Sequence, residues 1–137
     1  MPIRYVLLIA LCGFLVLPAA AQTIDVKGTD ASLDVAAWNI EWFGSASNGP
    51  TDDAQQLANV RAVIEQADID LWAVQEMADT DDFQTLLDQL GDDFDGVLAS
   101  NSGQQRIGFV WKTAMFSVRR IQHILVDEEY EFAFRPP

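Results

Sequence analysis

The sequence predicts an α/β domain with a mixed, mainly antiparallel sheet and helices on one face. Half of the 137 residues are hydrophobic (50%), which supports one folded domain rather than a disordered chain. In the first part of the chain, apolar runs of strand length alternate with segments of helical period. The later part contains strand-like runs without a helix between them. Strand, helix, strand, helix and then antiparallel strands is the order typical of such a sheet.

The first 21 residues have the features of a signal peptide. Arg4 supplies a positive charge, and the apolar run Tyr5–Leu17 is short for a membrane-spanning helix. Small residues follow at Ala19–Ala21, so we expect cleavage after Ala21. The product would be secreted or periplasmic and would have no stable membrane association. A retained membrane anchor is the alternative interpretation.

Residues 22–32 are polar and form the predicted flexible lead-in to a domain over residues 33–137. The apolar run at 33–40 predicts a strand buried on both faces. Gly, Ser, Asn and Pro at 43–50 predict a loop.

A first helix is predicted to begin at Asp52, with Thr51 as its N-cap. Its apolar stripe is Leu57, Val60, Ile64 and Ala67, and the residues expected off that stripe are Gln55, Gln56, Asn59 and Glu65.

The second half continues the same alternation and then changes to strands. Residues 69–75 predict another buried strand, and 80–90 predict an amphipathic helix capped by Asp79 or Thr80 and ended by Gly91. The remaining predicted strands are 94–98, 106–111 and 116–126, the last two forming a hairpin joined through 112–115.

Two helices can cover only one face of this sheet, and the chain stops at Phe134-Arg135-Pro136-Pro137. We therefore expect a truncated domain whose further elements would cover the other face. The alternative is a complete small domain that dimerises through the bare face.

Charge and cysteine content exclude some functions. Lys and Arg number 8 against 21 Asp and Glu, a net charge of −13. This excludes a basic nucleic-acid clamp, which needs cations to displace counterions from phosphates. The single cysteine, Cys12, lies in the leader, so the mature chain has no disulfide and no thiolate metal site.

Polar residues follow both predicted parallel strands. Asn39 and Glu41 lie at the end of the first strand, and Glu76 lies at the end of the second. Open α/β sheets place their sites at this edge. Carboxylates there can hold Mg²⁺, and an amide can orient a phosphate oxygen. The competing interpretations are a turn-forming Asn39, a solvated Glu41 and a helix-capping or surface Glu76.

Four short motifs resemble the endonuclease/exonuclease/phosphatase superfamily, the DNase I-like proteins. They are Trp38-Asn39-Ile40-Glu41-Trp42-Phe43-Gly44, Asp70-Leu71-Trp72-Ala73-Val74-Gln75-Glu76, Arg106-Ile107-Gly108-Phe109-Val110-Trp111 and Phe134-Arg135-Pro136-Pro137. The resemblance covers residues 33–137, and it implies the N-terminal half of a four-layer α/β sandwich.

The resemblance also implies roles for four residues. Glu76 matches the glutamate that binds the catalytic Mg²⁺ or Mn²⁺, and Asn39 matches the asparagine that helps to order the metal and phosphate site. Glu41 occupies a position where some relatives have a metal-facing Asp. Arg135 matches an arginine that contacts a substrate phosphate. The implied partner is a phosphoester substrate, with nucleic acid among the candidates.

The chain departs from the family pattern in its second half. Nothing matches the family's catalytic His, its Asp-x-Asn pair or its closing Asp-His pair. The only histidine, His123, is expected to be a strand or rim residue. We therefore expect an exported, metal-dependent phosphodiesterase- or nuclease-type hydrolase, present as an N-terminal fragment that is inactive alone. The alternative is a non-catalytic exported binding module with an eroded site.

Overall fold

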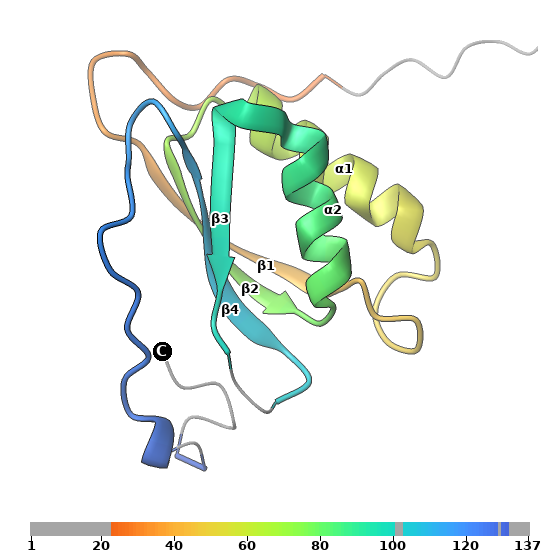
Figure 1. Ribbon diagram of the computed structural model, residues 1–137. Coiled ribbons are helices and arrows are strands. Elements are labelled where there is room, and N and C mark those ends of the chain that lie inside the picture. The colour runs from red at the N-terminus through yellow and green to blue at the C-terminus, as the bar shows by residue number, and fades with distance from the viewer. Residues whose placement is uncertain (1–22, 101–102, 129, 132–137) are drawn as a thin grey trace, which may run out of the picture.

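The computed structural model describes residues 23–100, 103–128 and 130–131. In this part of the chain, four strands form one sheet in the order β1-β2-β4-β3 (Figure 1). The strands are β1 (Val35–Phe43), β2 (Leu71–Met77), β3 (Phe94–Leu98) and β4 (Arg106–Lys112). β1 and β2 are parallel, and the other two pairs are antiparallel. The predicted mixed, mainly antiparallel sheet is confirmed.

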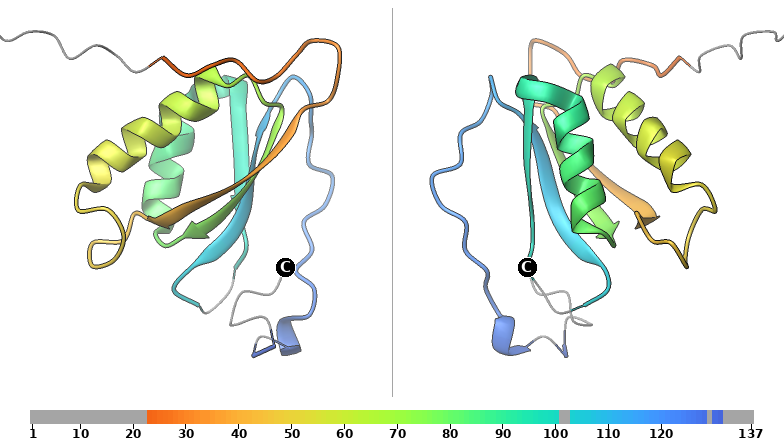
Figure 2. Two further views of the ribbon diagram at one scale, coloured as in Figure 1. Left: turned by 180° about the vertical axis from the view of Figure 1, so that it is seen from behind. Right: turned by 45° about the vertical axis from the view of Figure 1, so that its right-hand side comes forward.

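Helices α1 (Asp53–Gln66) and α2 (Thr80–Leu90) pack on the same face of the sheet (Figure 2). Two short 3-10 helices follow, η1 (Gly91–Asp93) and η2 (Val126–Glu128). The core between helices and sheet includes Ile40, Phe43, Val60, Ile64, Trp72, Val74, Met77, Phe83, Leu86 and Val110. None of the helices in the described ranges is long and apolar enough to cross a membrane.

The helix ends follow local capping rules, with one correction. Asp52, and not the predicted Thr51, caps α1, because its side chain accepts the N–H of Gln55 at 2.9 Å. Asp79 caps α2 by accepting the N–H groups of its first turn, as predicted. α2 ends at Gly91, whose φ of +72° suits glycine.

The prediction that the first strand is buried on both faces is wrong. Exposed and covered residues alternate along β1, with Val35, Ala37 and Asn39 exposed. β1 is an edge strand, and the helices cover only one face of the sheet, so its other side chains remain open. The strand also runs beyond the predicted end, to Phe43.

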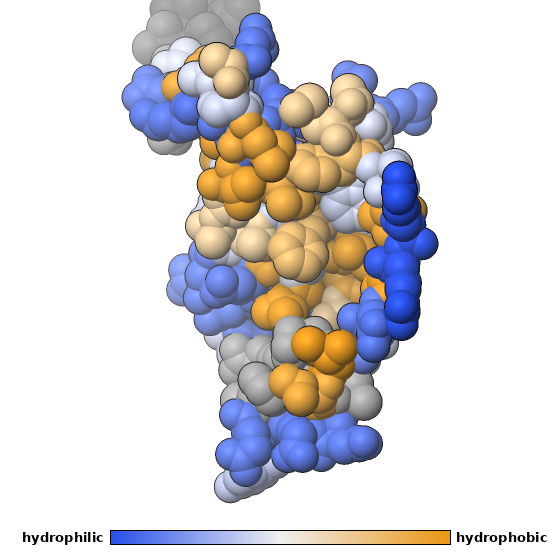
Figure 3. Space-filling model, turned by 90° about the vertical axis from the view of Figure 1, so that its left-hand side faces the viewer, coloured by the Kyte–Doolittle hydropathy of each residue, from blue (hydrophilic) through white to orange (hydrophobic). Residues whose placement is uncertain are grey.

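The predicted hairpin strand at 116–126 is also wrong, since no strand forms there. β4 already pairs with β2 on one side and β3 on the other, so neither of its edges is free. The segment instead passes over the face opposite the helices (Figure 2), where it and the sheet line a cavity of about 420 Å³. Trp111 is 5% exposed and Phe109 is 45% exposed, and apolar side chains gather on this face (Figure 3).

A polar cluster holds the amino-terminal end of β2 in place. The buried Asp70 carboxylate accepts the Asp34 N–H at 3.0 Å and contacts Lys112 Nζ at 3.0 Å. The Asp34 N–H, together with Lys112, holds the pKa of Asp70 below its usual value. Lys112 also bonds the Asp68 carboxylate at 2.6 Å, and its pKa is raised chiefly by that bond. These contacts join the start of β2 to the start of β1 and to the end of β4. They help to fix the register of the three strands, and the register decides which residues meet at the carboxyl ends of β1 and β2.

Candidate functional site

Asn39 and Glu76 meet at the carboxyl ends of β1 and β2. The parallel register pairs Asn39 with Gln75, which places the two strand ends side by side. Asn39 Nδ2 donates a hydrogen bond to Glu76 Oε1 at 2.8 Å. The structure thus brings together two of the residues that the sequence singled out, and it aims an amide at a partly buried carboxylate.

The backbone leaves regular strand geometry near the carboxyl ends of both β1 and β2. φ is +53° at Glu41, +54° at Trp42 and +60° at Glu76, and none of these residues is a glycine. The strand register shifts between Asn39 and Phe43 in β1, and again near Glu76 in β2. Left-handed backbone costs an L-residue about 1–2 kcal/mol, and such strain gathers at functional sites.

The irregularity in β2 changes the direction of Glu76. In a regular strand Glu76 would lie on the opposite face from Gln75, which is the partner of Asn39. The shift in register re-aims its carboxylate, as bulges next to sites commonly do, so that it reaches Asn39.

Glu41 contributes its backbone to this arrangement. Its N–H donates to Asn39 Oδ1 at 3.0 Å, which orients the Asn39 amide with Nδ2 toward Glu76. The Glu41 side chain is exposed, and within the described ranges no hydrogen bond or ion pair joins its carboxylate to Glu76. No group of three His, Cys, Asp or Glu side chains among the described residues is arranged to hold a metal ion.

The structure corrects the position predicted for Gln56. This residue was expected off the apolar stripe of α1, but it is only 8% exposed. Its Nε2 donates to the carbonyl oxygens of Ile40 at 2.8 Å and Glu41 at 2.9 Å. A signal was present, because Gln56 precedes the buried Val60 by one helical turn and Ile64 by two.

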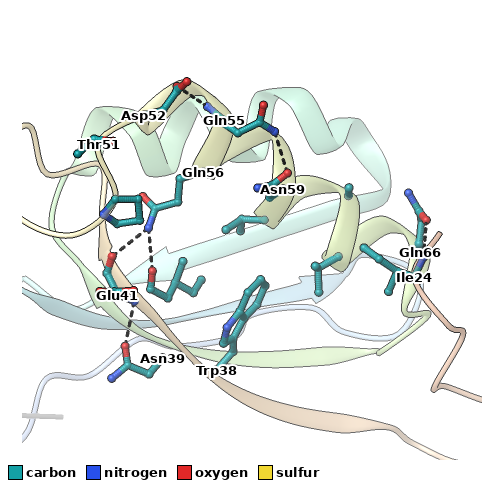
Figure 4. A pocket seen from close by; sticks show the side chains of 15 residues that line it. Ile24, Trp38, Asn39, Glu41, Thr51, Asp52, Gln55, Gln56, Asn59 and Gln66 are labelled. Carbon is teal, nitrogen blue, oxygen red and sulfur yellow. Dashed lines mark hydrogen bonds between the residues drawn. The ribbon is translucent and has the colours of Figure 1, made fainter. Parts of the chain in front are cut away.

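A cavity of about 690 Å³ lies between α1 and the edge strand β1 (Figure 4). Its lining includes Ile24, Trp38, Asn39, Glu41, Thr51, Asp52, Gln55, Gln56, Asn59 and Gln66. Figure 4 shows the Asn39 side chain pointing from β1 away from this cavity. Asn39 thus borders the cavity, while its side-chain amide is directed to Glu76 on the adjacent strand.

His123 lies apart from this pair, whereas Arg106 lies beside the carboxyl end of β2. His123 Nε2 is 3.4 Å from Ser100 Oγ, just beyond the end of β3, and β4 separates β3 from β2. Arg106 lies at the same end of the sheet, where its Nη1 donates to the Ala78 carbonyl at 3.0 Å. Arg135 and the predicted signal peptide lie outside the described residues.

Comparison with known proteins places the chain in a family. No curated protein and no solved structure matches it significantly. The model of the Endonuclease/Exonuclease/phosphatase family matches residues 36–134, which include both strand ends and most of the sheet. Members of this family act on phosphoester substrates and generally use divalent metal ions. The match extends over more than half of the sequence, so the chain belongs to the Endonuclease/Exonuclease/phosphatase family.

Proposed function

We propose that the chain is an exported, metal-dependent phosphodiesterase- or nuclease-type hydrolase whose Glu76 binds Mg²⁺ or Mn²⁺. The observation that carries the proposal is the 2.8 Å hydrogen bond from Asn39 to Glu76 between adjacent parallel strand ends. Family membership supplies the reaction class, and the strained backbone supports a role beyond folding.

The donor set at this edge fits a hard divalent cation. Mg²⁺ takes oxygen ligands, keeps several waters and is usually held by one or two carboxylates together with substrate phosphate. Glu76 offers a partly buried carboxylate, of which Oε1 accepts from Asn39. The exposed Glu41 is the second carboxylate at this strand end. With so few carboxylates, binding would be weak until a substrate phosphate adds its own oxygens.

Each residue has a distinct task in this proposal. Glu76 holds the cation, which when bound polarises a phosphoryl oxygen and lowers the pKa of a coordinated water. Asn39 keeps the Glu76 carboxylate in one orientation. Arg135 contacts a substrate phosphate, on the resemblance of its motif. The bound cation also offsets part of the −13 net charge, which would otherwise repel a phosphodiester.

The single histidine, His123, is not placed as a general base beside Glu76. It contacts Ser100, and within the described ranges no contact joins it to Asn39 or Glu76. A base must reach the proton that it removes, directly or through one water. We therefore expect the 137-residue chain alone to bind metal without detectable cleavage of plasmid DNA, RNA or bis-p-nitrophenyl phosphate.

Metal binding is tested by titrating the full chain with Mn²⁺ and following free Mn²⁺ by electron paramagnetic resonance. Glu76→Gln should weaken binding about 10-fold or more, because it removes the ligand charge. Glu65→Gln is the matched control, since Glu65 lies on α1 and pairs with Arg61. Equal affinity of wild type and folded Glu76→Gln would contradict the proposal.

Export is tested by expressing the precursor in a bacterial host and measuring the mass of the product. We expect an N-terminus at Gln22 in the periplasm or medium. A product that begins at Met1 and stays in washed membranes would contradict export.

Sequencing the DNA downstream of codon 137 distinguishes the hydrolase from the alternative, a binding module with an eroded site. We expect it to encode Gly-Asp-Phe-Asn-like and Ser-Asp-His-like segments, and the joined protein should cleave phosphodiesters in a Glu76-dependent manner. A downstream sequence without such segments would favour the binding module.

A further inference from the structure

We propose that Gln56 is a positioning residue for the site, which acts through the backbone of β1 to orient Asn39 and thereby Glu76. The part of its test that measures metal affinity rests on the function proposed above. The part that measures the conformation of Glu41 and Asn39 does not. The inference starts from a buried amide on α1 that bonds to a strand end rather than to its own helix.

The amide of Gln56 is used on both sides. Nε2 donates to the Ile40 and Glu41 carbonyls at 2.8 and 2.9 Å, and Oε1 accepts the Gly44 N–H at 3.3 Å. A buried polar side chain is tolerated only when its groups are bonded, so this one is committed to residues 40–44. Figure 4 shows the two donated bonds crossing from α1 to β1.

These bonds pair two carbonyl groups of β1 that lie where the register with β2 is interrupted. In the pairing of β1 with β2, matched residues run from Val35 to Asn39 and resume only at Phe43. The carbonyls of Ile40 and Glu41 fall within that gap, where the ladder supplies no matched partner. Gln56 satisfies both of them, and it does so where Glu41 and Trp42 take positive φ.

The conformation of Glu41 is passed on to the site. Its N–H bonds Asn39 Oδ1, which leaves Nδ2 as the atom that faces Glu76. This N–H lies in the same planar peptide group as the Ile40 carbonyl and points the opposite way, so the bond from Gln56 to that carbonyl fixes its direction. If the Ile40–Glu41 peptide plane turned, the N–H would move away from Asn39 and the Asn39 amide could rotate. Its oxygen would then face a carboxylate, which repels it. Gln56 therefore selects the Asn39 orientation that holds Glu76.

A second connection ties the same strand end to β2. The Phe43 carbonyl accepts the N–H groups of Ala78 at 2.9 Å and Asp79 at 3.2 Å, and Met77 alone separates Ala78 from Glu76. Movement of residues 40–44 would thus shift Glu76 in two ways, through its hydrogen bond with Asn39 and through the backbone that follows it.

The adjacent glutamine provides a matched control. Gln55 lies on the same helix, but it is exposed, and its side chain donates to Asn59 Oδ1 at 2.9 Å within α1. We compare Gln56→Met and Gln56→Glu with Gln55→Met in the full chain. Methionine removes all three bonds at similar size, whereas glutamate keeps an acceptor for Gly44 and loses the donors.

Two readouts separate positioning from a general loss of stability. In folded protein, Mn²⁺ affinity should fall about 10-fold in both Gln56 variants, as for other residues that orient metal ligands. Gln55→Met should change it less than about threefold. By nuclear magnetic resonance, the N–H to Hα couplings of Glu41 and Trp42 should move toward strand values, and the Asn39 Nδ2 protons should exchange faster.

The outcomes decide both proposals separately. Unchanged Mn²⁺ affinity and unchanged Glu41 and Asn39 signals in either folded Gln56 variant would overturn the positioning role. If Gln56→Met fails to fold, Gln56→Glu decides. If the wild-type chain binds no Mn²⁺, the proposed function fails, and the resonance measurements alone decide whether Gln56 orients Asn39.

Discussion

Gly44 follows β1 and lies against the first turn of α2, where a side chain would be costly for two reasons. Its φ is +76°, and placing alanine in left-handed backbone costs about 1–2 kcal/mol. An added Cβ would lie 2.6 Å from Asp82 Oδ2, 2.8 Å from Asp79 Cβ and 2.9 Å from Asp82 Cβ. Asp79 cannot easily move, because its carboxylate caps α2.

We predict that Gly44→Ala lowers the free energy of unfolding by about 2–5 kcal/mol. Overpacking adds about 1–3 kcal/mol to the backbone cost, and the total is large beside the roughly 5–15 kcal/mol that domains of this kind possess. The assay is urea unfolding followed by tryptophan fluorescence. Gly91→Ala measures a backbone cost without contacts, since no atom lies within 4 Å of an added Cβ, and its φ of +72° and ψ of −166° lie in a region that is nearly exclusive to glycine.

The contact contribution is isolated by combining Gly44→Ala with Asp82→Ala. The second change removes the carboxylate oxygen that lies 2.6 Å from the added Cβ, so the two should couple by about 0.5 kcal/mol or more. The reasoning is refuted if the coupling is zero and Gly44→Ala costs less than about 2 kcal/mol.

Two further predictions concern pH. The pKa of Asp70 is lowered by the Asp34 N–H and by Lys112. Its negative charge therefore stabilises the fold at pH values above 3.8, the pKa in the unfolded chain, and this contribution is lost as the pH falls through the lowered pKa. Asp70→Asn should therefore lower the urea midpoint at pH 7, and the difference from wild type should disappear in strong acid; equal midpoints at pH 7 would contradict this. The pKa of Asp82 is raised by burial and then by three neighbouring aspartates, so its ionisation opposes folding once the pH exceeds 3.8. Asp82→Asn should raise the urea midpoint at neutral pH, with a gain that fades on acidification, and a loss of stability at pH 7 would show that the charge is instead favourable at the start of α2.

Much of the architecture could be predicted from local patterns. Residue spacing predicted both helices, and the Asp79 cap and the Gly91 stop of α2 needed only neighbouring residues. Apolar runs predicted β2 and β3, and the polar residues that end the runs predicted which side chains would reach one edge of the sheet. These features depend on periodicity and capping, which operate within a few residues of the chain.

The candidate site was only partly predictable. Asn39 and Glu76 stand out because each ends an apolar run, and parallel neighbours bring such ends together. The positive φ at Glu41, Trp42 and Glu76 is not visible in the sequence, since these residue types ordinarily avoid that region. Gln56 was missed for a related reason, because its value to the fold depends on carbonyls that the irregular strand leaves unpaired.

The sequence by itself determined the helices, most of the strands and the family, since these follow from spacing, caps and short motifs. Tertiary structure alone decided that 116–126 forms no strand, although its composition suits one, because β2 and β3 already occupy both edges of β4. It also decided that β1 is open on one face and that the Asn39 amide faces Glu76. Each of these outcomes depends on which strand edge, sheet face or carbonyl remains free after distant segments have packed. Neighbouring residues in the sequence do not determine how distant segments pack.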